Sequence, residues 1–367
     1  MRIVVDGYEL GPQGAGVGRV AKNILPVLAS RREETRFFVL TREIALPFSR
    51  QNIQQIVLPS RGGYFRWQNG PFWRACQQLD PDLILAFNYT LPLICPWPSL
   101  LFVHDLSLLS HPEWFPPRTA RWRRLVLRYS LRRANLLIVP SKATAEEVDR
   151  HLKTKKNRVR IIYYGVEDKF NRARPEAVQR WKEARGLGSR RVIGFLGSIF
   201  RRRHLPLLVA AVNNLRPEWP DLFLYVVGQD RTYPAEDIAS LLSPDWIRWD
   251  EYLPETDLPL FYSACEALAY LSEYEGFGLP PLEALACGTI PVVLNRSSLG
   301  EILKGMAEFV EETTVEAVTK ALRRAITDET RGNEIRRNFE TRREMFSWSQ
   351  AAAKVADCLR EIKDKKL

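Results

Sequence analysis

The chain has 367 residues, of which 46% are hydrophobic and 26% are charged. This length favours about two domains over a single hydrophobic core, and the apolar content excludes a mostly disordered protein. The net charge of +11 is concentrated in residues 1–165, which hold 25 Lys and Arg against 12 Asp and Glu, so the rest of the chain carries −2.

Cysteine usage and apolar runs bear on where the protein works. The chain has five scattered cysteines without C-x-x-C spacing, which are Cys76, Cys95, Cys265, Cys287 and Cys358. An odd, scattered set favours neither a disulfide framework nor a zinc site and fits the reducing cytoplasm. The chain opens on a strand pattern rather than a leader, and no apolar run approaches the roughly 20 residues of a membrane span. We therefore expect a cytoplasmic protein, either soluble or held peripherally at a membrane.

Short apolar runs alternate with helical patterns along the chain, as in parallel α/β sheets. The expected strands are 3–5, 37–40, 56–58, 83–85, 100–103 and 136–139 in the first half, and 192–196, 223–227, 267–270 and 290–293 in the second. The polar stretch 151–190 separates the two series. The sequence therefore predicts two Rossmann-like domains, residues 1–167 and 168–346, and a final helix over 347–367.

A glycine-rich loop, Gly14–Arg19, follows the first strand and precedes a helical pattern. Glycines let backbone amides approach an anion or a sugar, because no Cβ stands in the way. The loop is therefore a candidate binding segment. A nicotinamide-binding loop is the rival interpretation, but the spacing is not G-x-G-x-x-G.

Two further polar motifs lie next to expected strands. His104 and Asp105 end an apolar strand and enter a loop, where α/β sheets usually present ligand-binding groups. Asp80-Pro81-Asp82 has a D-x-D spacing that binds metal in other proteins, but it merely precedes the strand 83–85. We interpret it as structural and expect no metal site.

A basic helix is expected near residues 117–133. Arginines recur there at intervals of three and four on one helix face, while apolar residues share another face. The two sets are Arg118, Arg121, Arg124, Arg128 and Arg132, and Trp122, Leu125, Val126 and Tyr129. The helix either lies near anionic lipid headgroups or carries solvated arginines over a core-facing apolar stripe. A nucleic-acid site fits the charge but lacks a supporting motif.

Residues 272–288 (SEYEGFGLPPLEALACG) are the most informative segment. Gly276 and Gly278 permit a sharp turn, and the prolines at 280 and 281 suit the first turn of a helix. The amides of Gly278 and Leu279 are then expected at a helix N-terminus, where the helix dipole suits a diphosphate.

Two carboxylates, Glu275 and Glu283, stand eight positions apart around this turn. Carboxylates so placed can accept hydrogen bonds from vicinal hydroxyls, one from a hexose and one from a ribose. A structural alternative is a strand–loop–helix connection with a capping glutamate.

This segment resembles the E-x7-E signature of the retaining glycosyltransferases of GT-B architecture in family four (group 1), which include bacterial polysaccharide and O-antigen mannosyltransferases. Flanking residues 262–268 and 288–293 resemble the same family, and similar blocks extend from Met1 to about Trp348. The resemblance implies two Rossmann-like domains facing a central cleft. It also implies an acceptor bound by the first domain, a nucleotide sugar bound by the second, and neither a cofactor nor a metal.

The resemblance also assigns roles to particular residues. It implies that His104 lies over the donor sugar with Asp105 as its orienting neighbour, and that Arg202 and Arg203 meet the diphosphate. In this chain arginine replaces the usual lysine of that pair, and Ser198 stands where some members have another arginine. The implied catalytic residues are His104, Asp105 and Glu275, and the implied donor-binding residues are Gly16, Val17, Ser198, Arg202, Arg203, Glu275, Gly276, Phe277, Gly278, Leu279 and Glu283.

Residues 247–254 match the segment whose backbone contacts the nucleobase in this family. Asp250 and Glu251 stand there in place of a commonly apolar residue and a glycine. We hypothesise that a carboxylate beside guanine favours GDP over UDP; an exposed acidic loop is the alternative.

The implied function is retaining transfer of a hexose from a nucleotide diphosphate sugar to a saccharide or lipid-linked acceptor hydroxyl, in polysaccharide or glycolipid biosynthesis. Mannose from GDP-mannose is the first choice of donor. The expected partners are donor, acceptor and an anionic membrane surface, without nucleic acid. A sugar-nucleotide epimerase or phosphorylase on the same fold is the alternative, and a non-catalytic basic binding protein for lipid or nucleic acid is a third.

Overall fold

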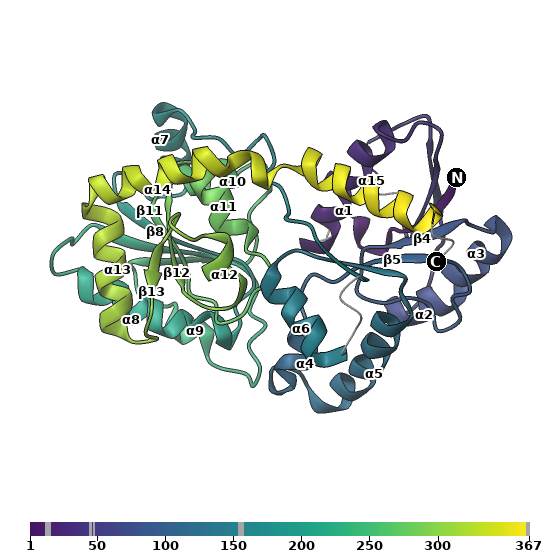
Figure 1. Cartoon of the computed structure of the whole chain (residues 1–367). Helices are drawn as coiled ribbons and strands as arrows, with labels where there is room; N and C mark the ends of the chain where they lie inside the picture. Colours follow the sequence, from purple (N-terminus) through teal and green to yellow (C-terminus); the bar gives the residue numbers. More distant parts are fainter. Residues whose placement is uncertain (12–15, 44–45, 47, 153–157, 365–367) are drawn as a thin grey trace. The chain divides into compact units, whose positions relative to one another are not determined.

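The computed structural model describes residues 1–11, 16–43, 46, 48–152 and 158–364, which form two compact units (Figure 1). The N-terminal unit comprises Met1–Gly165 and the chain from Met345, and the C-terminal unit comprises Val166–Glu344. The boundaries expected from the sequence lie after residues 167 and 346.

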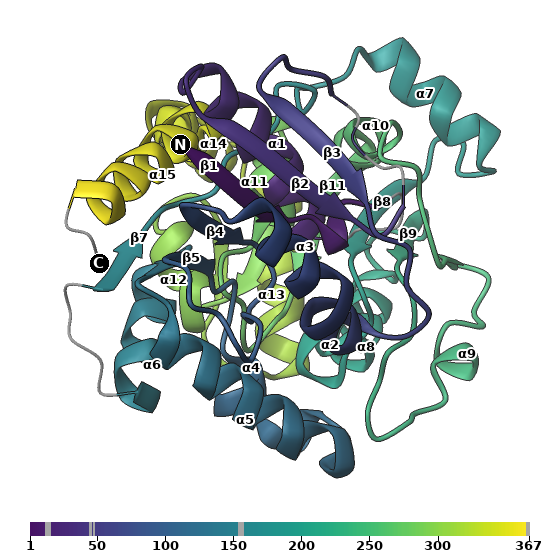
Figure 2. The same ribbon diagram turned by 90° about the vertical axis from the view of Figure 1, so that its right-hand side faces the viewer.

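The N-terminal unit is built on a parallel sheet of seven strands in the order β3-β2-β1-β4-β5-β6-β7 (Figure 2). Its strands are β1 (Arg2–Asp6), β2 (Arg36–Thr41), β3 (Ile53–Val57), β4 (Leu83–Ala86), β5 (Ser99–Phe102), β6 (Leu136–Val139) and β7 (Val159–Ile161). The inner strands are continuous apolar runs, because both faces of a parallel sheet are covered.

Helices cover this sheet. They are α1 (Gly16–Ser30), α2 (Tyr64–Trp67), α3 (Trp73–Leu79), α4 (Ser107–Ser110), α5 (Pro117–Arg133), α6 (Lys142–Leu152) and α15 (Trp348–Asp364), with a π-helical turn at Gln68–Phe72 and short 3-10 turns at Tyr8–Leu10 and Pro112–Trp114. A further 3-10 turn, Arg343–Phe346, includes the last residues of the C-terminal unit and the first that return to this one. Alternate strand residues such as Val4 and Ile84 pack against Trp67, Leu131 and Val148 from the helices of one face. Because successive side chains of a strand point to opposite faces, the intervening residues lie on the other face of the sheet.

The C-terminal helix α15 belongs to the N-terminal unit and packs against α1. The guanidinium of Arg32 donates a hydrogen bond to the carbonyl of Ala356 at 3.0 Å. Arg160 on β7 forms a two-point ion pair with Glu361, at 2.5 and 3.2 Å. These contacts and the buried apolar face of α15 hold the end of the described chain on this unit.

The C-terminal unit has a parallel sheet of six strands in the order β10-β9-β8-β11-β12-β13. Its strands are β8 (Arg191–Leu196), β9 (Leu222–Val227), β10 (Ile247–Asp250), β11 (Cys265–Tyr270), β12 (Ile290–Leu294) and β13 (Glu308–Val310). Its helices are α7 (Pro175–Ala184), α8 (Leu205–Leu215), α9 (Ile238–Leu241), α10 (Leu258–Ala264), α11 (Leu279–Ala286), α12 (Ser297–Ile302), α13 (Val315–Thr327) and α14 (Glu329–Arg342), with a 3-10 turn at Arg201–Arg203.

Both faces of this second sheet are also covered. On one face, Ile193 and Leu224 pack with residues of α8 and α13. On the other face, the rings of Tyr225 and Phe261 meet edge to face with their centres 5.5 Å apart. The ring centre of Trp181 on α7 lies 6.0 Å from that of Tyr225.

Each sheet reverses its strand order at one place. The reversal lies at the pair β1 and β4 in the first sheet and at β8 and β11 in the second. In doubly wound sheets, ligands bind beyond the carboxyl ends of the strands at such a switch point. The loops that follow these four strands are therefore where a site is expected.

The five cysteines are all free and buried, consistent with a reduced protein. Within the described ranges, none of the helices combines the length and apolar character that crossing a membrane requires.

Candidate active site

The switch point of the C-terminal unit brings together two of the predicted segments. The loop after β8 carries Ser198, Arg202 and Arg203, and the loop after β11 carries Glu275. The amide of Glu273 donates to the carbonyl of Arg202 at 2.9 Å and joins the two loops directly.

Arg203 and Glu275 form the central contact of this site. The Nε and Nη2 atoms of Arg203 lie 3.2 and 2.9 Å from Oε1 of Glu275. The same guanidinium donates to the hydroxyl of Tyr270 at 2.9 Å and to the carbonyl of Ser198 at 3.1 Å. Burial alone would lower the pKa of Arg203, but its contacts with Tyr270 and Glu275 outweigh this and raise it. The pair is therefore a charged hydrogen-bonded unit with little access to solvent.

The backbone of Glu275 is held as firmly as its side chain. Its carbonyl accepts hydrogen bonds from the hydroxyls of Ser297 and Ser298, at 2.9 and 2.7 Å. Both serines begin α12, which follows β12. Three separate strand-to-helix connections thus fix the position of one carboxylate.

The neighbouring side chains differ in exposure. Arg202 is half-buried, with its guanidinium 4.1 Å from the ring centre of Phe200. His204 donates from Nε2 to Glu273 at 2.8 Å, and Glu273 is exposed. Of the two adjacent arginines, Arg202 is thus the more accessible and Arg203 the more buried.

The turn before α11 has the conformation that its glycines suggested. Gly278 has φ of +98°, and a Cβ there would lie 2.6 Å from Leu299, so only glycine fits. Gly276 and Phe277 are buried in this turn, and Leu279 begins the helix. Because the next two residues are prolines without N–H groups, the amides of Gly278 and Leu279 are the donors of this helix N-terminus.

Glu283 lies inside α11 and is 1% exposed. Its Oε2 accepts a hydrogen bond from the hydroxyl of Tyr262 at 2.7 Å. Tyr262 belongs to α10, so this bond also ties α10 to α11.

His104 lies just beyond β5 in the N-terminal unit. Its Nε2 is 2.6 Å from the carbonyl of Phe87, which only accepts, so this nitrogen carries the proton. Nδ1 of the neutral ring then accepts from the hydroxyl of Tyr164 at 2.6 Å. Burial lowers the pKa of His104 below 6.5 and outweighs the Phe87 contact and the charge of Asp105, so the ring is neutral at pH 7.

The carboxylate of Asp105 accepts hydrogen bonds from residues other than His104. Oδ2 accepts from the hydroxyl of Tyr89 at 2.8 Å, and Oδ1 accepts from the amide and hydroxyl of Ser107 at 2.8 and 2.6 Å. These bonds shape the entry to α4. The two ring nitrogens of His104 are oriented by Phe87 and Tyr164.

Gly16 and Val17 form the first turn of α1, and Gly14 and Ala15 lie outside the described residues. A Cβ at Gly18 would lie 2.2 Å from the carbonyl of Glu9, so this glycine allows α1 to lie against the turn after β1.

A buried polar cluster at the end of β1 was not identified from the sequence. Asp6 accepts from the hydroxyl of Tyr64 at 2.6 Å, from Gln68 at 3.2 Å and from the amide of Tyr8 at 3.2 Å. Burial raises the pKa of Asp6 to about 6 despite these hydrogen bonds. Its position at the carboxyl end of a strand beside the switch point is the signal that could have found it.

The Asp80-Pro81-Asp82 motif has structural contacts. Oδ2 of Asp82 accepts from the amide of Arg2 at 2.6 Å, and Asp80 forms an exposed ion pair with the Arg2 side chain at 3.4 Å. The two carboxylates thus fix the start of β1 beside β4.

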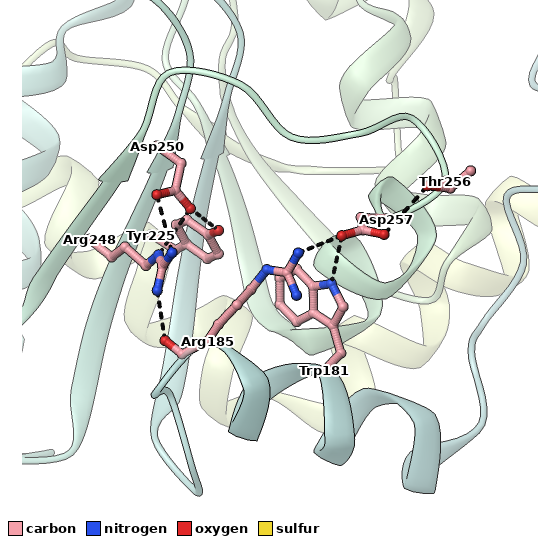
Figure 3. Close-up of polar contacts among 7 residues, drawn as sticks. All are labelled: Trp181, Arg185, Tyr225, Arg248, Asp250, Thr256 and Asp257. Carbon is pink, nitrogen blue, oxygen red and sulfur yellow. Dashed lines mark hydrogen bonds and ion pairs between the residues drawn. The ribbon is translucent and has the colours of Figure 1, made fainter.

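Asp250 was hypothesised to face a guanine, but its carboxylate is bound within the unit. It accepts from the hydroxyl of Tyr225 and from Arg248 at 2.9 and 3.3 Å (Figure 3). Arg248 also donates to the carbonyl of Arg185 at 2.8 Å, and Arg185 pairs with Asp257 over the ring of Trp181. Both oxygens of Asp250 thus serve the network between β10 and α7, whereas Glu251 is exposed.

We expect Asp250→Asn to destabilise the fold by about 1–2 kcal/mol at pH 7 without changing the preference among nucleotides. Burial tends to raise the pKa of Asp250, but the hydrogen bonds from Arg248 and Tyr225 outweigh it and lower this pKa below 3.8. A carboxylate whose pKa is lower in the folded than in the unfolded protein stabilises the fold at pH values above its unfolded pKa. This contribution to folding stability is lost as the pH falls through the folded-state pKa. The stability difference from Asp250→Asn, measured by denaturant unfolding, should therefore shrink below about pH 4. Loss of GDP binding with unchanged stability would restore the nucleobase role.

Two family models match the chain and together cover most of it. "Glycosyltransferase Family 4" matches residues 14–170, and "Glycosyl transferases group 1" matches residues 178–344. Among solved structures, Anabaena Alr3699/HepE in complex with UDP-glucose superposes with a TM-score of 0.77 at 18% identity, covering 98% of this chain and 100% of that one. WaaG, a glycosyltransferase involved in lipopolysaccharide biosynthesis, gives 0.72 at 18% identity and covers 98% and 99%.

Curated relatives are similar at modest identity. O-antigen chain mannosyltransferase B of Escherichia coli is 24% identical over 69% of this chain and 67% of its own length. The serotype-specific mannosyltransferase WbdA of Escherichia coli is 25% identical over 76% of this chain, which spans only 36% of that longer protein.

The doubly wound sheets and the solved structures that they match define a glycosyltransferase fold of GT-B architecture. The chain belongs to the group 1, family four glycosyltransferases. The expected α/β fold and family are thus confirmed.

Proposed function

We propose that the protein transfers a hexose from a nucleotide diphosphate sugar with retention of configuration, and that the C-terminal unit binds the donor. The observation that carries this proposal is the Arg203–Glu275 pair at the switch point of the second sheet. A carboxylate there, fixed through both its side chain and its backbone, is preorganised to accept hydrogen bonds from sugar hydroxyls.

The diphosphate would lie between the N-terminus of α11 and the arginine turn. The amides of Gly278 and Leu279 supply a helix dipole, and Arg202 supplies a charge that is accessible to ligand. Arg203 acts on the same region while it holds Glu275, and Ser198 lines the loop. These groups stabilise the negative charge that develops on the leaving diphosphate. The carboxylate of Glu283 anchors the ribose by accepting a hydrogen bond from a ribose hydroxyl in place of the one from Tyr262.

The reaction is a substitution on one face of the sugar. The acceptor oxygen forms a bond to the anomeric carbon as the bond from that carbon to the phosphate oxygen breaks, and a phosphate oxygen takes the acceptor proton. The arginines and the helix dipole carry the charge of the leaving group in this scheme, which uses neither a metal ion nor a cofactor.

The N-terminal unit is proposed to bind the acceptor. The neutral His104 can accept a sugar hydroxyl at Nδ1 in place of the Tyr164 hydroxyl, while its bond to Phe87 keeps the ring oriented. Asp105 fixes the loop through Ser107, and the first turn of α1, with Gly16 and Val17, adds backbone contacts.

Mannose from GDP-mannose is the proposed donor sugar. The support is the similarity to O-antigen chain mannosyltransferase B and to the serotype-specific mannosyltransferase WbdA, both of which are named for mannosyl transfer. A lipid-linked acceptor would place the protein in the cytoplasm, peripherally at the inner face of the cytoplasmic membrane.

Calorimetric titration with GDP, UDP and ADP tests the donor site. We expect GDP to bind most tightly, and Glu283→Gln to weaken that binding about tenfold through a lost ribose contact. Glu266→Gln, an exposed glutamate on β11 of the same unit, serves as the matched control and should bind like the wild type. Absence of binding to any of the three nucleotides would remove the donor site, and tighter binding of UDP would replace the proposed base.

A further inference from the structure

The N-terminal unit has a patch of large apolar side chains that are exposed to solvent. Its members come from α5 and from the loop after β4, and we name them the α5 patch: Leu93, Ile94, Trp122, Leu125 and Tyr129. Their exposed fractions range from 38% for Leu93 to 66% for Ile94. Several large exposed apolar side chains gathered in one place mark an interaction surface more often than scattered single ones do.

The patch is held together by specific contacts. The hydroxyl of Tyr129 donates to the carbonyl of Leu93 at 2.7 Å, and Arg133 donates to the carbonyl of Cys95 at 3.1 Å. The ring of Trp122 meets Phe65 of α2 edge to face at 5.1 Å. The loop after β4 is thus joined to α5 by hydrogen bonds between residues 36 and 38 positions apart in the sequence.

The structure divides the apolar stripe expected on α5. Val126 is buried, as the core-facing alternative requires, whereas Trp122, Leu125 and Tyr129 are exposed to solvent. The other buried residues of this helix are Ala120, Leu127, Ser130 and Leu131. Figures 1 and 2 both show α5 on the outside of its unit.

The same helix is strongly basic. It contains seven arginines and no acidic residue, namely Arg118, Arg121, Arg123, Arg124, Arg128, Arg132 and Arg133. Across the described part of the chain, none of the seven forms an ion pair with a carboxylate. Arg118, Arg121 and Arg132 are exposed on the face that Leu125 shares.

We propose that the α5 patch is a docking surface for an anionic phospholipid bilayer, with its apolar side chains in the headgroup–acyl boundary and its arginines on the phosphates. Exposed arginines beside tryptophan, tyrosine and aliphatic side chains have the composition of an interfacial helix. A nucleic acid would also attract the arginines, but Leu125 and Ile94 offer nothing to a phosphate backbone or a base edge. The surface gives the membrane location in the proposed function a definite place in the fold.

Vesicle co-sedimentation of the full chain tests this surface. We expect binding to phosphatidylcholine vesicles that contain phosphatidylglycerol, weak binding to pure phosphatidylcholine, and loss of binding at high salt. Replacing Arg118, Arg121 and Arg132 together by glutamine should lower the partition coefficient about 100-fold, since each basic residue contributes about fivefold. The double variant Ile94→Asp/Leu125→Asp should lower it by at least about tenfold through the apolar contribution.

Matched controls come from outside the patch. The triple variant Arg174→Gln/Arg180→Gln/Arg337→Gln removes the same charge from exposed positions of the C-terminal unit, and Met345→Asp changes an exposed apolar residue elsewhere. Both controls should bind vesicles within about threefold of the wild type if location matters more than total charge.

Three outcomes would overturn the proposal. These are no vesicle binding by the wild type, equal losses in the control and patch variants, or patch-dependent binding of a duplex DNA probe without binding to vesicles. Nucleotide titration of the same variants separates this inference from the donor site, because the patch substitutions lie in the other unit and should leave GDP binding unchanged. Failure of the donor site would likewise leave the vesicle result intact.

Discussion

Replacing Glu275 by glutamine is expected to reduce sugar transfer by at least about 100-fold, because the carboxylate is proposed to hold the hexose hydroxyls in the transition state. The substitution keeps the shape of the side chain but removes the charge that Arg203 meets at 2.9 Å. Since the two side chains are only 16% and 10% exposed, the uncompensated arginine should also cost about 2 kcal/mol of folding stability. Initial rates with the donor found by titration, and denaturant unfolding, measure the two effects.

Glu273→Gln is the matched control for Glu275→Gln. Glu273 lies two residues earlier in the same loop, is exposed, and pairs with His204 at 2.8 Å. We expect its transfer rate to stay within about threefold of the wild type and its stability to change by less than about 1 kcal/mol. A folded Glu275→Gln or Glu275→Ala variant with near-normal turnover would refute the central assignment.

Arg203→Met is expected to destabilise the C-terminal unit by about 3–5 kcal/mol, the usual result of removing one member of a buried ion pair. The loss follows because Glu275, Tyr270 and the carbonyl of Ser198 all depend on this guanidinium. Transfer should fall with it, since Glu275 is no longer held in place. Arg203→Lys keeps the charge but not the planar fork, so it should recover part of the stability and little of the rate.

Arg202→Ala distinguishes the role of Arg202 from that of Arg203. Arg202 is half-buried over Phe200, so its loss should weaken nucleotide binding about tenfold and change stability by less than about 1 kcal/mol. Calorimetry and denaturant unfolding of both single variants give the comparison. If Arg203→Met retained full stability and lost only nucleotide affinity, Arg203 would be a phosphate ligand and not the support of Glu275.

The inner strands of both sheets were predictable because a strand covered on both faces must be apolar throughout. The outer strands β7, β10 and β13 were missed for the complementary reason. β10 carries Arg248 and Asp250, and β13 carries the buried Glu308, which is paired with Arg324 and Arg331 at 2.8 and 3.3 Å. Arg248 and Asp250 pair with each other and also bind Arg185 and Tyr225, while Arg160 on β7 pairs with Glu361. These polar groups are satisfied by tertiary contacts, so the local apolar pattern did not indicate a strand.

The helix α5 also shows what a local sequence pattern could not predict. Its arginine spacing predicted a basic helix here, and the structure has one over Pro117–Arg133. It also carries apolar residues around much of its circumference, both Val126 and Leu127 and the stripe of Trp122 and Leu125. Which of these faces is buried depends on where the sheet and neighbouring helices lie, and this is not encoded in the period of one helix.

The sequence by itself determined the family, the two parallel sheets and the loop that bears Glu275, because glycine, proline and apolar spacing act on the local backbone. The tertiary structure decided the partners of the charged side chains. It placed Arg203 rather than its neighbours on Glu275, turned Asp250 towards Arg248, and gave His104 its proton on Nε2. Three consecutive arginines are chemically alike in the sequence, and only the turn that carries them and the burial around it distinguish one from the next.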